Sequence, residues 1–287
     1  MPETISESTI KGAVPDILCD QFSDEGWARI SSHVPDEMDL TIYINHRELV
    51  TILCTPTKLN CLVLGFLYAE GIISSLDDVA TMRVCEEESV ADVMLSKTEY
   101  KLPTLRTLTS GCGGGVTFKT QGRRIDSGLV VTPTEVLSLM KQFQKQTELY
   151  RLCGGVHASA LSDTKNLLVV SEDIGRHNTL DKIQGECLLR GLSTKDGLLL
   201  STGRISSEML MKAAKMQTPI VVSRSSPTGR AISLAHDLGI TLVGYARGNR
   251  LSVYSYPERL GRSVWSTTNP AELGQSLDKP LARMAKR

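Results

Sequence analysis

Cys112 lies in the run Ser110-Gly111-Cys112-Gly113-Gly114-Gly115-Val116, where four glycines leave its thiol without neighbouring side chains to pack against. Glycine lets the backbone adopt positive φ and approach a partner closely. Successive backbone N–H groups in such a loop can form a concavity that attracts anions, and their dipoles favour the thiolate, the nucleophilic form of cysteine. The loop therefore predicts an activated cysteine that carries a sulfur or acyl group. The alternative is a flexible glycine turn in which the cysteine is incidental.

Four polar clusters follow or open expected strands later in the chain. They are Val156–Ser159, Glu172–Asn178, Ser201–Glu208 and Gly244–Arg250. Open α/β sheets bind ligands beyond the carboxyl ends of their strands, and free N–H groups at a helix start attract anions. Three of the clusters contain arginine, which binds phosphate in a bidentate manner. Together the clusters predict a site for an extended phosphorylated ligand.

Each cluster also has an ordinary structural interpretation. His157 on an apolar strand can be a core histidine, and Asp173 can pair locally with Arg176. Ser206 can be only a helix cap, and the Gly-Asn pair within 247–250 is ordinary turn chemistry. The repetition of the pattern on one expected sheet edge favours the binding-site hypothesis.

The composition is typical of a soluble globular protein, with 41% hydrophobic and 22% charged residues in a chain of 287. The formal net charge is zero, which argues against a nucleic-acid polymer as partner, because phosphate backbones select an excess of Lys and Arg. Residues 203–262 nevertheless contain nine Lys and Arg against three Asp and Glu, a local charge of +6. This excess favours a small anionic ligand, and a solvated basic face is the alternative.

The seven cysteines predict neither a zinc ribbon nor a disulfide scaffold, because their number is odd and no two have Cys-x-x-Cys spacing. With no apolar signal region and no apolar run of about 18 residues, we expect a cytoplasmic protein with reduced thiols and no membrane partner. The chain also lacks the dinucleotide-fold and P-loop glycine patterns and the His-x-Glu and Pro-Cys-x-x-Cys pair of zinc deaminases. We therefore expect no zinc catalysis and no structural metal.

The length predicts two domains, with mobile tails at 1–16 and 263–287. The N-terminal domain, 17–131, is expected to be of α+β type and to carry the Cys112 loop. Within it we expect a hairpin over 40–53 that turns at Asn45-His46. A helix over 57–70 that ends before Gly71 and a strand over 91–96 complete it.

Residues 132–262 alternate strands with helices, which predicts a mixed sheet covered on both faces. Thr132, Pro133 and Glu135 predict a helix start with a capping box, and this helix is expected to reach about Leu149. The expected strands are 155–161, 166–171, 197–201, 219–223, 240–246 and 251–254, and the further helices are 178–189, 206–216 and 229–237.

Four motifs occur in order between residues 30 and 260. They are Ser-Gly-Cys-Gly at 110–113, Glu-Asp-Ile-Gly-Arg-His-Asn at 172–178, Ser-Thr-Gly-Arg-Ile-Ser-Ser-Glu at 201–208 and Tyr-Ala-Arg-Gly-Asn-Arg at 245–250. In this combination the chain resembles the formate dehydrogenase accessory sulfurtransferases of the FdhD type. The resemblance implies a homodimer whose C-terminal domain has a cytidine-deaminase-like α/β/α fold with a mixed sheet and without zinc.

The resemblance also implies an activity. Such proteins take sulfur from a cysteine desulfurase as a persulfide and pass it to the molybdenum or tungsten centre of a bis(molybdopterin guanine dinucleotide) cofactor destined for formate dehydrogenase. The persulfide position corresponds to Cys112, and the family's cofactor-binding segment corresponds to Tyr245, Ala246, Arg247, Gly248, Asn249 and Arg250. We expect Gly203 and Arg204 to contribute to phosphate binding, and His177 and Asp173 to orient the ligand or move a proton.

One position departs from the family pattern. The family often has Cys-x-x-Cys in the loop, and here the second position is Gly115. A second thiol could expel the sulfur by forming a disulfide with Cys112; without it, the metal centre or an external reductant must complete the transfer. We therefore predict a one-cysteine mechanism. The alternatives are a chaperone that delivers the cofactor without covalent sulfur chemistry and a simple nucleotide-binding scaffold.

Overall fold

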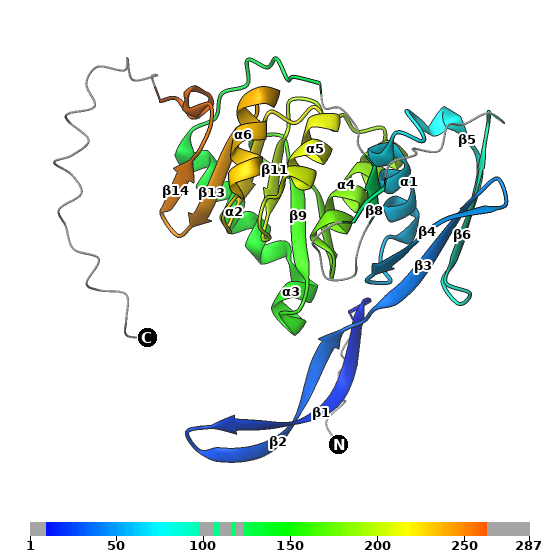
Figure 1. Cartoon of the computed structure of the whole chain (residues 1–287). Helices are drawn as coiled ribbons and strands as arrows, with labels where there is room; N and C mark the ends of the chain where they lie inside the picture. Colours follow the sequence, from blue (N-terminus) through cyan, green and yellow to red (C-terminus); the bar gives the residue numbers. More distant parts are fainter. Residues whose placement is uncertain (1–9, 98–105, 109–115, 119–122, 263–287) are drawn as a thin grey trace.

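The computed structural model describes residues 10–97, 106–108, 116–118 and 123–262. Within them the strands form one six-stranded sheet, one four-stranded sheet and two pairs of strands (Figure 1). The loop that contains Cys112 and both expected tail regions, apart from residues 10–16, lie outside the described residues. The domain boundaries expected from the sequence stay a prediction.

The six-stranded sheet has the order β10-β9-β11-β12-β13-β14. Its strands are β9 (His157–Ser162), β10 (Leu167–Asp173), β11 (Leu198–Ser201), β12 (Ile220–Ser223), β13 (Thr241–Arg247) and β14 (Arg250–Val253). Strands β11, β12 and β13 run parallel, whereas β9 is antiparallel to both of its neighbours and β14 is antiparallel to β13. The carboxyl ends of β10 to β13 therefore share one edge with the amino ends of β9 and β14.

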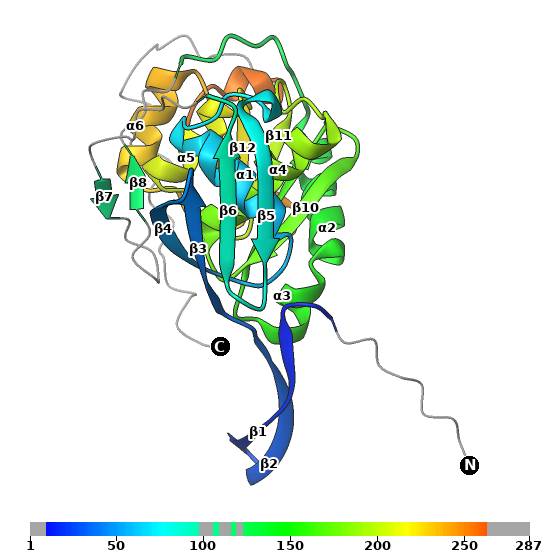
Figure 2. The same cartoon turned by 90° about the vertical axis from the view of Figure 1, so that its right-hand side faces the viewer.

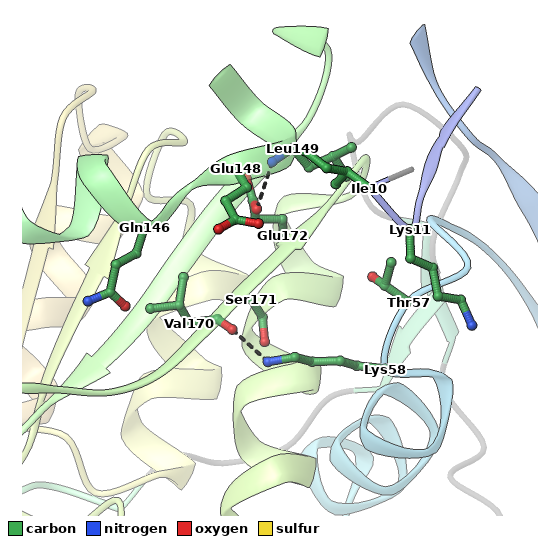
Figure 3. A pocket seen from close by; sticks show the side chains of 10 residues that line it. All are labelled: Ile10, Lys11, Thr57, Lys58, Gln146, Glu148, Leu149, Val170, Ser171 and Glu172. Carbon is green, nitrogen blue, oxygen red and sulfur yellow. Dashed lines mark hydrogen bonds between the residues drawn. The ribbon is translucent and has the colours of Figure 1, made fainter. Parts of the chain in front are cut away.

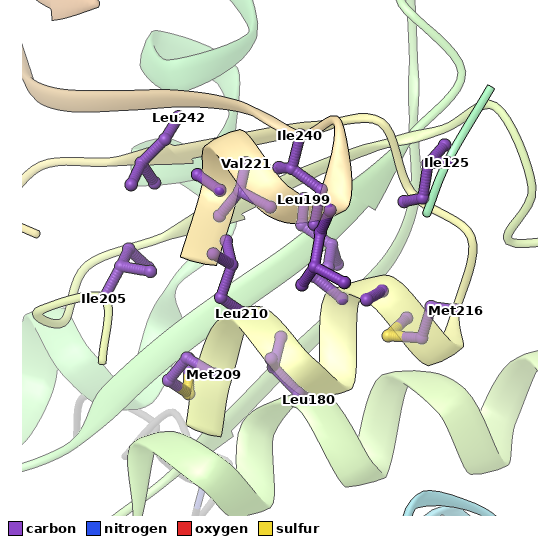
Figure 4. Packing of buried hydrophobic residues seen from close by; sticks show 14 of the residues in the cluster. Ile125, Leu180, Leu199, Ile205, Met209, Leu210, Met216, Val221, Ile240 and Leu242 are labelled. Carbon is purple, nitrogen blue, oxygen red and sulfur yellow. The ribbon is translucent and has the colours of Figure 1, made fainter. Parts of the chain in front are cut away.

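Successive side chains of a strand point to opposite faces of the sheet. Because both sets are apolar in these strands, helices cover both faces. Leu199, Val221 and Leu242 belong to the core under α4 (Arg176–Arg190), α5 (Ser207–Lys215) and α6 (Gly229–Leu238), which Figure 4 shows. Their neighbours Leu198 and Val222 belong to the opposite core, under α2 (Pro133–Gln146). The prediction of a mixed sheet covered on both faces is confirmed, while the cytidine-deaminase-like topology stays a prediction.

The four-stranded sheet has the order β4-β3-β6-β5 and packs on α1 (Leu59–Glu70). Its strands are β3 (Met38–Ile44), β4 (Arg47–Cys54), β5 (Val79–Cys85) and β6 (Val90–Leu95). Asn45 and His46 both adopt positive φ in the turn between β3 and β4, as the expected hairpin requires. Gly71 ends α1 in the left-handed conformation, so the hairpin and the end of this helix are both confirmed.

Helix α1 lies directly on α4, and two glycines set their separation (Figures 1 and 2). A Cβ on Gly65 would lie 1.7 Å from the carbonyl oxygen of Asp181, and one on Gly185 would lie 1.9 Å from that of Cys61. Both values are far inside van der Waals contact. Only glycine therefore allows these two backbones to approach this closely, and this contact joins the four-stranded sheet to the six-stranded one.

A two-stranded arm extends from the N-terminal side of the molecule (Figures 1 and 2). It consists of β1 (Ala13–Ser23) and β2 (Gly26–Pro35), so ordered structure begins inside the segment that the sequence analysis assigned to a tail. Most side chains of the arm are exposed. The arm therefore has no buried face, and its sequence needs no apolar-polar alternation. Without that pattern the sequence carried no strand signal.

The remaining elements are short. They are α3 (Glu148–Cys153), the 3-10 turns Leu76–Asp78 and Pro257–Leu260, and the paired strands β7 (Arg106–Leu108) and β8 (Val116–Phe118). Thr132 and Glu135 form the predicted capping box, but α2 ends at Gln146, earlier than expected. The chain then starts α3, whose first N–H groups donate to Glu172. No helix in the described part of the chain is long and apolar enough to cross a membrane.

Candidate functional site

The sheet topology places the four polar clusters along one edge, as the sequence predicted. Backbone hydrogen bonds link neighbouring clusters: Thr202 N–H donates to Ala158 O at 3.0 Å, and Arg224 N–H donates to Ser201 O at 3.0 Å. Tyr245 N–H donates to the loop after β12, at Ser225 O, over 3.1 Å. The loops at this edge therefore form one continuous, internally bonded surface.

His177, in the first turn of α4, contacts the start of α5. Its Nε2 lies 3.4 Å from Ser206 Oγ and 3.3 Å from Glu208 Oε2. Burial, followed by the charges of Lys212 and Arg176, lowers the pKa of His177 to about 3. The ring is therefore neutral near pH 7, so its contact with the Glu208 carboxylate is not an ion pair, and its Nε2 shares a hydrogen bond with Ser206 Oγ.

His157 and Gly203 lie beside this pair at the centre of the edge. A Cβ on Gly203 would lie 3.1 Å from His157 Nδ1 and 3.4 Å from Arg176 Cβ, so glycine lets the loop pass close to the imidazole. Burial lowers the pKa of His157, and Arg176 and Arg204 lower it further. Arg204 is exposed and forms no hydrogen bond or ion pair with a described residue. Because both imidazoles are neutral, the charge comes from the guanidinium groups of Arg176 and Arg204, which give this part of the edge a positive potential that favours anions.

The turn between β13 and β14 adds two further guanidinium groups to the edge. Gly248 and Asn249 form the turn, with Gly248 at φ 58° and Arg247 opposite Arg250. Arg247 Nε donates to the carbonyl oxygen of Arg224 at 2.5 Å, which fixes its direction. Arg250 is exposed and, like Arg204, has no hydrogen-bond or ion-pair partner among the residues that the structure describes.

Tyr245 presents its ring outward from the same strand. Its φ of 51° is left-handed and falls where the register between β13 and β14 shifts. The residue is 44% exposed although its neighbours Gly244 and Ala246 are buried. An exposed aromatic ring beside arginines can stack on a planar base.

Two expected site residues are fully buried. The side chain of Ala246 is part of the core on the α2 face, so only its backbone could reach a ligand. Asp173 is also at 0% exposure. Its Oδ1 accepts from Gly175 N–H and from Asn178 Nδ2, both at 2.8 Å, and its Oδ2 accepts from Thr55 N–H at 3.1 Å. These contacts favour a structural role for Asp173 over direct contact with a ligand.

Lys182 is the partner of Asp173 that the sequence analysis did not identify. Its side chain is completely buried, and its Nζ lies 2.6 Å from Asp173 Oδ2. The same ammonium donates to Thr55 O and Thr57 Oγ1, each at 3.0 Å. A lysine next to the apolar Ile183 in the middle of an expected helix was the available signal, but two of its partners, Thr55 and Thr57, lie more than a hundred positions away in the sequence.

The described residues of this edge carry groups that suit an anion. No group of three or more His, Cys, Asp or Glu in the described ranges is arranged to hold a metal ion. The edge instead offers two unpaired guanidinium groups, two neutral imidazoles, an exposed aromatic ring and the start of α5, where Ser206 caps Met209 N–H. This set of groups can bind phosphates and a planar base.

Comparisons with known proteins show which family the chain belongs to. The chain is 38% identical over 232 residues to the sulfur carrier protein FdhD of Staphylococcus aureus (strain MRSA252), covering 78% of this chain and 88% of that protein. It is 39% identical over 241 residues to the sulfur carrier protein FdhD of Bacillus subtilis (strain 168), covering 81% and 92%.

Among solved structures, the chain is similar to a crystal structure from Desulfotalea psychrophila of a protein assigned as a formate dehydrogenase accessory protein. The TM-score is 0.71 at 27% identity, and the match covers 86% of this chain and 99% of that one. The model of the FdhD/NarQ family matches residues 35–261, which include all four sequence motifs. This chain therefore belongs to the FdhD/NarQ family.

Proposed function

We propose that this protein is a sulfur carrier for the maturation of formate dehydrogenase. Cys112 receives sulfur from a cysteine desulfurase as a persulfide and delivers it to a bis(molybdopterin guanine dinucleotide) cofactor, which is its substrate and whose metal is molybdenum or tungsten. Membership of a family whose relatives are sulfur carrier proteins is the observation that carries this proposal. The protein works as a homodimer, and formate dehydrogenase is the final acceptor.

The loading step needs only one thiol on this protein. The Cys112 thiolate attacks the outer sulfur of the donor persulfide, the S–S bond of the donor breaks, and the desulfurase cysteine leaves as a thiolate. Delivery of the sulfur to the metal as sulfide requires two electrons. Since Gly115 stands where a second loop thiol could supply them, they come from the metal centre or from an external thiol.

The strand-end edge would hold the guanine dinucleotide part of the cofactor. Arg204 and Arg250 are free to bind its phosphates, and Arg247 is already directed along the edge by Arg224 O. Tyr245 offers a ring for the guanine, and Gly203 lets its loop pass close to the His157 imidazole. These contacts do not need the metal itself.

Intact-mass spectrometry after incubation with a cysteine desulfurase and cysteine tests the carrier role. We expect an adduct of about 32 Da, one sulfur atom, that maps to Cys112 and disappears on reduction. Cys112→Ser should abolish it, whereas Cys153→Ser, a half-buried thiol outside the loop, should load normally. Loss of loading in Cys153→Ser but not in Cys112→Ser would refute the one-cysteine mechanism.

A cofactor chaperone is the second candidate, and the glycine at position 115 is the observation that favours it. Such a protein would use the same strand-end edge but no covalent sulfur chemistry. The Cys112→Ala variant separates the two functions. A chaperone variant should still mature formate dehydrogenase, and a carrier variant should not.

A further inference from the structure

A cavity of about 450 Å³ lies beside the edge strand β10 and reaches Glu172, the first residue of the 172–178 cluster. It is lined by Ile10, Lys11, Thr57, Lys58, Gln146, Glu148, Leu149, Val170, Ser171 and Glu172 (Figure 3). The lining thus comes from the segment before β1, the entry to α1, the junction of α2 with α3, and strand β10. Its size falls in the range of about 300–1,000 Å³ that is usual for small-molecule sites.

One end of the cavity carries two carboxylates. Figure 3 shows Glu148 and Glu172 next to each other at the start of α3. Glu172 accepts from Leu149 N–H at 3.1 Å and from Tyr150 N–H at 2.7 Å. Burial raises its pKa, and the charge of Glu148 contributes in the same direction. Neither carboxylate forms an ion pair with a described residue, so this end favours a cation.

The other end carries an ammonium and a hydroxyl. Lys58 Nζ donates to Val170 O at 2.7 Å and to Glu186 Oε2 at 2.6 Å, which leaves its third N–H for another acceptor. Ser171 is 2% exposed, and its Oγ has no hydrogen-bond partner among the described residues. A buried hydroxyl without a partner is unfavourable. A ligand oxygen at this end would accept from both groups.

We propose that this cavity binds a small zwitterion of the amino-acid class. Its carboxylate would lie on Ser171 and Lys58, and its ammonium on Glu148 and Glu172. Lys11 is already paired with Glu86 and Lys58 with Glu186. The lining therefore offers a remaining N–H of Lys58 and a hydroxyl at one end and two carboxylates at the other, which suits a ligand that carries one charge of each sign. A simple anion would be repelled by the adjacent carboxylates of Glu148 and Glu172, and a metal ion would be repelled by Lys58.

Isothermal titration of the full-length protein with each of the common L-amino acids tests this site. We expect saturable binding of at least one, and at least tenfold weaker binding of its N-acetyl and carboxamide forms, which each lack one charge. Ser171→Ala and Glu148→Gln should each weaken binding by at least threefold. Gln142→Ala, an exposed position on α2 outside the cavity, is the matched control and should not change it.

The thermal midpoint of Ser171→Ala provides a second measurement. Because the hydroxyl has no partner in the described protein, the midpoint should stay the same or rise while binding weakens. A lower midpoint would show that Ser171 has a structural partner and would overturn the proposal. So would the absence of binding across the whole panel, or binding that neither Ser171→Ala nor Glu148→Gln weakens. The proposed sulfur loading on Cys112 requires no ligand in this cavity, so loading should be normal in Ser171→Ala.

Discussion

At the scale of single residues, two exposed arginines distinguish the strand-end edge from the rest of the basic surface. Arg204 and Arg250 have no partner among the described side chains, while Arg247 is held by a backbone oxygen and Arg259 donates to the carbonyl oxygens of Ser127 and Gly239. Open α/β sheets commonly bind ligands beyond the carboxyl ends of their strands. Long side chains there that have no partner among the described residues are available to bind phosphate. Their freedom gives the proposed cofactor contacts a direct test.

Replacement of Arg204 or Arg250 by Ala should weaken the binding of GDP about tenfold each, because a charge-assisted hydrogen bond is worth about 1.5–3 kcal/mol. Isothermal titration at low and high salt checks this, and the variants should also lose part of the salt dependence. Arg29→Ala, in the distant arm, is the control and should bind GDP as the parent protein does. Unchanged affinity in both site variants would move the nucleotide elsewhere.

His177 should make the protein acid-sensitive. Its folded pKa of about 3 lies below its ordinary value of about 6.5, so its contribution to stability is complete above about pH 6.5 and is lost as the pH falls toward 3. Burial and the charges of Lys212, Arg176 and His157 oppose protonation, and Glu208, at 3.3 Å, does not outweigh them.

Urea unfolding between about pH 7 and pH 5 measures this effect. The parent protein should lose stability on acidification, by at most about 1.4 kcal/mol per pH unit from this group, and His177→Gln should lose less. His236→Gln, on the exposed side of α6, should keep the full acid sensitivity. An equal loss in His177→Gln would show that His177 is not the titrating group.

Removal of the buried ammonium should be strongly destabilising. Lys182→Met leaves the Asp173 carboxylate buried without its counter-charge, and broken pairs of this kind cost about 3–5 kcal/mol. Asp173→Asn combined with Lys182→Met should recover part of that loss, since neither charge of this pair then remains. Urea midpoints check both, with Arg29→Met, in an exposed pair, as the control that should leave the midpoint unchanged.

At the scale of elements, β10 shows how the edge of the large sheet is protected. Three cationic side chains donate to successive outward carbonyl oxygens of this strand: Arg190 to Leu168 O at 3.2 Å, Lys58 to Val170 O at 2.7 Å and Lys182 to Glu172 O at 3.3 Å. Charged side chains on an edge strand prevent pairing with another chain. Because Lys58 lies directly before α1, its contact with Val170 O also joins α1 to the six-stranded sheet.

The crossing of α1 and α4 should tolerate no side chain at its two glycines. Gly65→Ala and Gly185→Ala would each place a methyl within 2 Å of a backbone oxygen, so both should lower the free energy of unfolding by at least about 2 kcal/mol, although alanine has the higher helix propensity by about 1 kcal/mol. Gly229→Ala, at the open start of α6, should not destabilise. A stable Gly65→Ala variant would show that the helices can move apart without cost.

At the scale of the whole molecule, the two large sheets should unfold together. They share the α1–α4 contact, and the Thr55–Lys182–Asp173 group crosses between them at full burial. Native-state hydrogen exchange should therefore give amides of β3 and of β11 similar opening free energies, within about 1 kcal/mol. In Gly185→Ala the two values should separate, and two well-separated values in the parent protein would contradict a single cooperative unit.

The sequence alone predicted the strands of residues 132–262 and most of the helices, apart from the separate α3, and it singled out the strand-end clusters as candidate site residues. Local periodicity, the Thr132 capping box and the turn residues Asn45 and His46 act over a few positions, so each can be recognised without a fold. Alternation of strands and helices then brings the strand-end clusters to one edge, because parallel strands point their carboxyl ends the same way.

Only the tertiary structure decided which polar residues are exposed at the strand ends and which are buried where they hold the fold together. Asp173 and Arg204 look alike as charged residues at strand ends, yet Asp173 is buried against Thr55, 118 positions away, and Arg204 is exposed. The arm β1–β2 was missed because it buries no face of its own. The roles of Gly65 and Gly185 depend on a partner helix far along the chain. Such contacts depend on how segments that are far apart in the sequence pack together, and the local sequence pattern does not encode this packing.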